Sequence, residues 1–172
     1  DSTGIIHRNR TDLTPIKSSM LDKTNPDNLQ GDLAEAMRGA DVFVGLAVAD
    51  TVTPQMVSSM NKDSIVFAMA NPIPEIMPDL ALAAGAAVVG TGRSDFPNQI
   101  NNSLVFPGIF RGALDIKATR ITTSMKLSAA KALAALITEP TSECILPYSL
   151  DRNVSKAVSQ ATSAAWTAEH PA

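Results

Sequence analysis

Residues 40–70 read ADVFVGLAVADTVTPQMVSSMNKDSIVFAMA, two apolar runs separated by a segment that carries a helix-start signal. The runs 40–48 and 64–70 show no alternation of polar and apolar residues, which is typical of strands buried on both faces of a parallel sheet. Between them, Thr53 predicts a helix N-cap and Pro54 the first helical residue. The stretch therefore predicts a strand, a helix and a second strand.

The same alternation continues on both sides of this unit. Residues 31–40 predict a short helix with Asp32 as its N-cap, and residues 77–85 predict another, with Asp79 as its N-cap. Residues 86–92, AAVVGTG, predict a third buried strand. Strands that alternate with helices at a spacing of about 20 residues are typical of βαβ units, whose right-handed crossovers make the strands parallel neighbours. We therefore predict an α/β fold that contains part of a Rossmann-type doubly wound parallel sheet.

The pattern changes after residue 106. Three further segments read as helices with no strand between them, namely residues 107–118, 122–137 and 151–166. We therefore predict two parts, a sheet part over residues 1–106 and a helical C-terminal tail over residues 107–172.

The composition is that of a globular protein, since 45% of the 172 residues are hydrophobic and 18% are charged. The net charge of −3 comes without a dense lysine or arginine cluster, which argues against nucleic acid as a partner. No apolar run approaches the roughly 20 residues of a membrane span, so no membrane association is expected. Cys144 is the single cysteine, which fits a reducing, cytoplasmic setting, and its apolar neighbours predict that its side chain is buried.

In a doubly wound sheet, ligands bind beyond the carboxyl ends of the strands. The residues that follow the predicted strands are therefore the candidates for a binding site. These candidates are Leu46, Ala47 and Val48 after the first strand, Asn71 after the second, and Asn101 and Asn102 on the segment that follows the third.

Three of these candidates are asparagines, whose neutral amides offer two hydrogen-bond donors and an acceptor. Such amides suit a site that holds a small polar ligand without adding charge. They also suit loops, because the dipeptide at Asn71 starts turns and the pair Asn101 and Asn102 would equally brace the long loop on which it lies. The residues alone leave both interpretations open. On the same loop, Arg93 and Asp95 are expected either to form an ion pair or to remain solvated charges.

Asp1 raises the question of a dinucleotide ligand. In dinucleotide-binding folds, a carboxylate at the end of the second strand accepts hydrogen bonds from the adenosine ribose, and Asp1 followed by a small turn matches the end of such a strand. The sequence contains no GxGxxG phosphate loop. If the fold binds a dinucleotide, we expect the first strand, the glycine turn and the first helix to precede residue 1. The chain also begins without Met, so we interpret it as a piece of a longer protein.

Five longer motifs occur in order along the chain: GADVFVGL (39–46), TPQMVSSM (53–60), IVFAMANPIPEIMPDLA (65–81), VVGTGRSDFPNQINNSLVFPGIFRGALD (88–115) and MKLSAAKALA (125–134). In this order they resemble the malic enzyme family, most closely its shorter bacterial members. The resemblance runs over almost the whole chain. It is specific, because an ANP turn followed by GRSDFPNQ and a pair of asparagines is not a general Rossmann pattern.

The resemblance implies oxidative decarboxylation of L-malate to pyruvate and CO₂, with a nicotinamide cofactor as hydride acceptor and Mg²⁺ or Mn²⁺ as the metal. It implies that Asn71 and Asn102 bind the substrate, and that Asn71 and Asn101 contact the nicotinamide side of the cofactor. Asp1 matches the ribose-binding acid of the family. The segment 46–48 matches the stretch that lines the cofactor between adenosine and nicotinamide.

The resemblance also implies that residues 1–106 are part of an NAD(P)-binding Rossmann domain. The catalytic lysine and tyrosine of the family, its acidic metal ligands and its glycine loop are then expected before Asp1. We therefore expect no catalytic or metal-binding residue within residues 1–172, and no activity from these residues alone. The intact enzyme is expected to be a cytoplasmic homodimer or higher homo-oligomer.

The choice between the two nicotinamide cofactors depends on the charge near the ribose. A carboxylate at Asp1 favours NAD, because it repels the 2′-phosphate of NADP. Ser2, Arg8 and Arg10 are close enough in sequence to bind such a phosphate instead. The sequence favours NAD and leaves NADP open.

Two other functions are compatible with a Rossmann-type sheet. One is an NAD-dependent dehydrogenase of the amino-acid type, against which the ANP turn and the asparagine pair argue. The other is a non-catalytic Rossmann binding module. Residues before Asp1 that lacked the lysine and the acidic ligands would favour this module.

Overall fold

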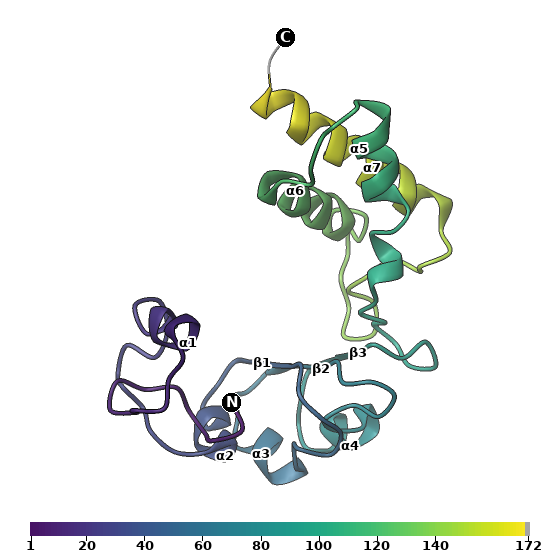
Figure 1. The fold of residues 1–172 in the computed structure, drawn as a ribbon. Helices are drawn as coiled ribbons and strands as arrows, with labels where there is room; N and C mark the ends of the chain where they lie inside the picture. The colour runs from purple at the N-terminus through teal and green to yellow at the C-terminus, as the bar shows by residue number, and fades with distance from the viewer. Residues whose placement is uncertain (171–172) are drawn as a thin grey trace.

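The computed structural model describes residues 1–170. A 3-10 turn, η1 (Asn102–Leu104), precedes the last three helices. Figure 1 shows the sheet in the middle of the molecule, with α2, α3 and α4 on one side of it and α5, α6 and α7 gathered on the other. The main elements are α1 (Pro15–Met20), α2 (Leu33–Met37), β1 (Val42–Gly45), α3 (Pro54–Ser58), β2 (Ile65–Ala68), α4 (Pro78–Ala83), β3 (Val88–Thr91), α5 (Gly108–Asp115), α6 (Thr123–Ala134) and α7 (Arg152–Glu169).

The strands form one parallel sheet in the order β1-β2-β3. The register places Val42 beside Ile65 and Ile65 beside Val88, so the carboxyl ends of all three strands meet at one edge. The prediction of an α/β fold with a parallel Rossmann-type sheet and a helical C-terminal end is confirmed.

The main core lies between one face of the sheet and the helices α2, α3 and α4. Met37 of α2, Val57 of α3 and Ala81 of α4 belong to one buried cluster with Val66 and Ala68 of β2. Their burial stabilises the packing of the helices on the sheet, because apolar side chains leave water there. The loops at the carboxyl edge of the sheet are therefore anchored to a packed core.

The prediction that the strands are buried on both faces is wrong for β1. Val42 and Val44 are 48% and 56% exposed, whereas Val66 in the central strand is fully buried. The reason is that β1 lies at the edge of the sheet, and the described helices α2 to α4 pack on only one of its faces. An apolar run without alternation identifies the strand correctly, but it does not reveal which face is covered.

Two of the three predicted N-caps are confirmed. The side chains of Asp32 and Thr53 each accept a backbone N–H from the residue three positions on, at the starts of α2 and α3. The prediction for Asp79 is wrong, because the N-cap of α4 is Met77, which makes no side-chain capping bond. Pro78 takes the first helical position, where its missing N–H is not needed. Asp79 therefore lies in the first turn, where a carboxylate interacts favourably with the helix dipole.

The helices α5, α6 and α7 share buried clusters of their own, separate from the core under the sheet. Two glycines let α5 approach α7 closely. A Cβ atom on Gly108 would lie 2.8 Å from the carbonyl oxygen of Ser155, and one on Gly112 would lie 2.4 Å from the carbonyl oxygen of Ser159. Ser163 of α7 also donates its hydroxyl to the carbonyl of Gly112 at 2.9 Å. The backbones of the two helices are therefore nearly in contact.

Asn98 connects the sheet to the segment that leads into α7. Its buried amide donates from Nδ2 to the carbonyl oxygens of Val89 in β3 and Ser142, at 3.0 and 2.8 Å, and its Oδ1 accepts the N–H of Ile145 at 2.9 Å. The prediction that Cys144 is buried is wrong, since its side chain is exposed. The segment is a surface loop held through its backbone, which leaves the Cys144 thiol at the surface.

None of the helices among residues 1–170 combines the length and the apolar character that crossing a bilayer requires.

Candidate functional site

A pocket of about 620 Å³ lies at the carboxyl end of β1. Leu46 and Val48, which are 80% and 66% exposed, give it an apolar wall, and Asp1 and Asp32 are the charged residues that line it. Ala47 lies between the two apolar residues and lines the pocket as well. The structure therefore brings Asp1 together with the segment 46–48, although more than forty positions separate them in the sequence.

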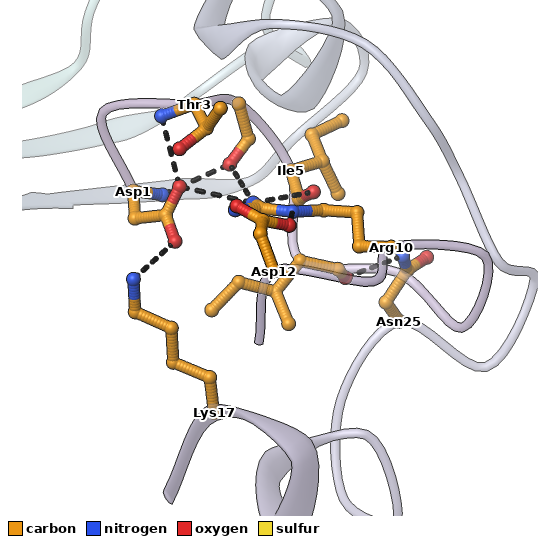
Figure 2. A network of polar contacts seen from close by, with 9 residues as sticks. Asp1, Thr3, Ile5, Arg10, Asp12, Lys17 and Asn25 are labelled. Atoms are coloured by element: carbon orange, nitrogen blue, oxygen red, sulfur yellow. Dashed lines mark hydrogen bonds and ion pairs between the residues drawn. The ribbon is translucent and has the colours of Figure 1, made fainter. Parts of the chain in front are cut away.

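Figure 2 shows how the carboxylate of Asp1 is held. Its Oδ1 accepts the backbone N–H of Thr3 at 2.9 Å and pairs with Arg10 at 2.9 Å. Its Oδ2 pairs with Nζ of Lys17 at 2.6 Å. Lys17 belongs to α1, so the carboxylate is fixed between its own turn and a helix that lies further along the chain.

Arg10 lies at the centre of this network, with only 8% of its side chain exposed. Its Nε and Nη2 pair with the two carboxylate oxygens of Asp12 at 2.9 and 2.6 Å. This side-chain hydrogen bonding lowers the pKa of Asp12 to about 2 and raises the pKa of Arg10. The carboxylates of Asp1 and Asp12 are thus balanced by the cations of Arg10 and Lys17, and both charges of the Arg10–Asp12 pair persist at neutral pH.

Asn71 lies exposed three residues beyond the end of β2, where its Nδ2 donates to the carbonyl oxygen of Met69 at 3.4 Å. The chain that leaves β3 passes close to this amide. A Cβ atom on Gly92 would lie 3.0 Å from Nδ2 of Asn71, so a larger residue at position 92 would press on the Asn71 side chain. The turn after β2 and the loop after β3 therefore meet at the carboxyl edge of the sheet.

Of the two alternatives for Arg93 and Asp95, the structure shows the ion pair. Nε and Nη2 of Arg93 contact the two oxygens of Asp95 at 2.9 and 2.6 Å, and Nη1 donates to the carbonyl oxygen of Pro72 at 3.4 Å. The hydrogen bonding within the pair lowers the pKa of Asp95 and raises the pKa of Arg93. The guanidinium also lies over the ring of Phe96, 5.4 Å from its centroid. Arg93 thus links its own loop to the turn that carries Asn71.

Asn101 and Asn102 use their amides differently. Asn101 is the N-cap of η1, and its Oδ1 accepts the backbone N–H of Ser103 at 2.9 Å. Asn102 is exposed as the first residue of η1, and its side chain makes no hydrogen bond to any of residues 1–170. The loop interpretation therefore holds for Asn101, whereas the amide of Asn102 remains free to bind a ligand.

Glu75 is a residue that the sequence analysis missed. Its side chain is fully buried, and its carboxylate accepts the backbone N–H groups of Ala47 and Ala70 at 2.7 and 3.0 Å. No cation among residues 1–170 pairs with it. The available signal was a glutamate in the apolar, proline-rich run of residues 71–78, where a solvated charge is unexpected.

The part of the chain that the structure describes contains no group of three or more His, Cys, Asp or Glu side chains arranged to hold a metal ion. The acidic residues at the pocket already have partners: Asp1 pairs with Arg10 and Lys17, and the side chain of Asp32 caps α2. Residues 1–170 therefore do not fit a metal centre, and no chemical step can be assigned to a metal from them.

Residues 1–165 match the protein family described as malic enzyme, NAD binding domain. The chain belongs to the malic enzyme family. This confirms the resemblance that the motifs indicated, and it agrees with the Rossmann-type sheet and with a pocket at the carboxyl end of β1.

Two curated relatives show the similarity in sequence. The chain is 53% identical over 139 residues to an NAD-dependent malic enzyme from Geobacillus stearothermophilus, an alignment that covers 81% of this chain and 29% of that protein. It is 50% identical over 141 residues to an NADP-dependent malic enzyme from Rhizobium meliloti strain 1021, covering 81% of this chain and 18% of that protein.

A solved structure shows the same similarity in the fold. The malic enzyme from Pyrococcus horikoshii Ot3 superposes with a TM-score of 0.86 at 46% sequence identity, covering 90% of this chain and 36% of that one. The chain spans about two fifths or less of the length of the curated relatives it matches.

Proposed function

We propose that the intact protein catalyses the oxidative decarboxylation of L-malate to pyruvate and CO₂ with reduction of NAD, and that this chain supplies its cofactor-binding part. The observation that carries the proposal is the family match over residues 1–165, which includes the pocket at the end of β1. Within the chain, residues 1–106 are proposed as part of the NAD-binding Rossmann domain and residues 107–172 as a helical C-terminal segment.

The residues of the pocket fit one half of a dinucleotide. An apolar wall at Leu46 and Val48 suits the flat face of an adenine, and a fixed carboxylate at Asp1 suits a ribose hydroxyl. Oδ1 of Asp1 already accepts from Thr3 and Arg10, whereas Oδ2 pairs only with Lys17. Since each carboxylate oxygen has two lone pairs, one acceptor site remains on Oδ2 for a ligand. When bound, the nicotinamide would supply the chemistry by accepting the hydride.

The asparagines are proposed to act at the other end of the cofactor. Asn71 and Asn102 bind the substrate carboxylate, and Asn71 and Asn101 lie against the nicotinamide side. The free amide of Asn102 and the exposed amide of Asn71 support this assignment, because both retain donors for a ligand. Asn101 acts mainly by shaping the turn that presents Asn102.

NAD is proposed as the preferred cofactor. The carboxylate of Asp1 lines the pocket and would lie near a 2′-phosphate, which it repels. Arg10 and Lys17 reduce this repulsion but are both engaged by carboxylates, so neither offers an unpaired charge to a phosphate. The preference for NAD is therefore expected to be moderate, and NADP remains a weaker alternative.

The remaining parts of the enzyme are proposed to come from outside this chain. They are the catalytic lysine and tyrosine and the acidic ligands of Mg²⁺ or Mn²⁺. The intact enzyme is proposed to be a cytoplasmic homo-oligomer, with malate as its substrate and with no nucleic acid or membrane as a partner.

The test is a steady-state assay of the intact protein, with malate and either NAD or NADP, followed at the absorbance of the reduced nicotinamide. We expect malate-dependent reduction and a kcat/KM that is several-fold higher with NAD. Glutamate and leucine serve as control substrates. Their oxidation in place of malate would establish an amino-acid dehydrogenase, and a strong preference for NADP would overturn the assignment of Asp1.

A further inference from the structure

We propose that Glu75 is a positioning residue, which holds the cofactor-side loop after β1 and the Asn71 turn after β2 in one fixed arrangement. The proposal rests on the proposed function for the ligands of these two loops. Glu75 does not line the pocket and is fully buried, so it acts through the backbone that it binds.

The carboxylate of Glu75 bridges the carboxyl ends of two neighbouring strands. Oε1 accepts the N–H of Ala47, two residues beyond the end of β1, at 2.7 Å. Oε2 accepts the N–H of Ala70, two residues beyond the end of β2, at 3.0 Å. Each oxygen thus binds one loop, and the rigid carboxylate sets the distance between the two loops.

The backbone next to Glu75 adds two further links to the loop after β1. The carbonyl of Glu75 accepts the N–H of Val52 at 2.9 Å, and the carbonyl of Pro74 accepts the N–H of Asp50 at 3.2 Å. The loop that follows β1 is therefore held at three points, residues 47, 50 and 52, by the short segment 74–75.

Gly45 makes room for this bridge. A Cβ atom at position 45 would lie 2.6 Å from both Cδ and Oε1 of Glu75. The last residue of β1 must therefore be glycine if the carboxylate is to reach between the strands. This close approach shows that the local backbone is built around the carboxylate.

Burial of a carboxylate without a cation is costly, and an apolar side chain of similar volume would fill the same space at a lower cost. Two charge-assisted hydrogen bonds offset part of that cost. Unlike an apolar residue, the carboxylate fixes the positions of two backbone N–H groups. Ala47 lies between Leu46 and Val48 of the pocket wall, and Ala70 directly precedes Asn71, so both sides of the proposed site depend on that position.

The test uses Glu75→Gln in the intact protein. Glutamine has the same shape, but its amide nitrogen must face one of the two N–H donors, which removes one hydrogen bond and opposes two donors. We expect the Kd of NADH, measured by fluorescence titration without malate, to rise about 10- to 100-fold. Asp79→Asn is the matched control, because it removes an exposed carboxylate four residues further on and should leave the Kd unchanged.

Hydrogen–deuterium exchange separates positioning from general destabilisation. In E75Q the amide of Ala47 or Ala70, whichever faces the new amino group, should exchange faster, while the amide of Val66 in the core strand should keep its wild-type rate. Equal acceleration at all three would show that Glu75 serves overall stability and would overturn the proposal. A folded E75Q protein with the wild-type Kd would also overturn it.

If E75Q does not fold, Glu75→Asp replaces it, since it keeps the charge and both oxygens but withdraws them by one methylene. The same rise in Kd is expected, and failure of both variants to fold would refute a positioning role. The proposed function is judged separately, by malate turnover of the wild-type protein. A protein that binds NADH but does not oxidise malate would refute that function, and the E75Q titration would still decide the role of Glu75.

Discussion

Asn101 and Asn102 are neighbours in the sequence, but only one of their amides is engaged within residues 1–170. Oδ1 of Asn101 accepts a backbone N–H as the N-cap of η1, and the side chain of Asn102 stays free at the surface. A free, exposed amide contributes little to folding, since water satisfies it as well as protein does. Asn102 is therefore the residue at which binding and stability can be separated most cleanly.

Replacing Asn102 by alanine in the intact enzyme should lower kcat/KM for malate roughly ten- to a thousandfold. This corresponds to about 1.4–4 kcal/mol, the range expected for one well-placed hydrogen bond to a charged or developing group. The melting temperature should stay within about 2 °C of the wild type, because the surface amide has no partner among the described residues. Steady-state kinetics and thermal unfolding of the same preparations measure both effects.

Ser103→Ala is the matched control for this variant. Ser103 is exposed on the same turn, and its hydroxyl makes no hydrogen bond to another of residues 1–170. We expect wild-type kinetics from it. A well-folded N102A protein with unchanged malate kinetics would remove Asn102 from the site.

How much of the site could be predicted depends on the distance over which each residue acts. Asp1 and the segment 46–48 could be predicted to act together because the family resemblance assigns both to the cofactor, and in the structure they line one pocket. Lys17 and Glu75 could not, because each acts on a group far along the chain: Lys17 on Asp1, and Glu75 on a backbone N–H 28 residues away. No local pattern encodes such a partner.

At the scale of elements, the local signals were largely sufficient. Strand runs and the caps at Asp32 and Thr53 depend on neighbouring residues, and these predictions are confirmed. The exposure of Val42 and Val44 depends on what covers the sheet, which their own sequence does not contain. The close approach of α5 and α7 could not be predicted from local sequence either. The glycines of α5 are required only because α7 packs against them.

Gly112→Ala should destabilise the packing of α5 on α7. Alanine favours a helix over glycine by about 1 kcal/mol, but its Cβ would lie 2.4 Å from the backbone oxygen of Ser159 and 2.9 Å from Cβ of Thr162. Overpacking costs about 1–3 kcal/mol, and a contact with backbone belongs to the upper half of that range because the backbone cannot rotate away. After the gain of about 1 kcal/mol in helix propensity, we expect a net loss of about 1–2 kcal/mol in the free energy of unfolding. Denaturant unfolding of the intact protein measures this loss.

Gln160→Ala is the control for this prediction, because Gln160 lies on α7 next to Ser159 but is exposed. Its effect should stay within about 0.5 kcal/mol. A G112A protein as stable as the wild type, or more stable, would show that the helices separate easily enough to admit a methyl group. The close packing of α5 on α7 would then carry no energetic weight.

At the scale of the whole molecule, the chain consists of a sheet covered on one face and a helical group with its own core. Asn98 is a buried link between β3 and the segment before α7. The uncovered apolar residues of β1 and the pocket at its end lie on the same strand. The exposed apolar face of β1 therefore continues into the lining of the pocket, which includes Val44.

The exposed edge strand and the incomplete pocket lead to a prediction for residues 1–172 expressed by themselves. The sequence contains no GxGxxG turn, so these residues offer no glycine-rich helix start to hold a pyrophosphate, and the pocket supplies only a ribose carboxylate and an apolar wall. The unpaired edge of β1, with Val42 and Val44 half exposed, also favours association between copies.

We expect NAD to bind with a Kd above about 1 mM, which corresponds to less than about 4 kcal/mol of binding free energy, and we expect no malate-dependent reduction. Calorimetric titration, with light scattering to follow association, is the direct measurement. Micromolar binding of NAD by monodisperse residues 1–172 would contradict this account, because the pocket at the end of β1 would then hold the cofactor without a phosphate loop.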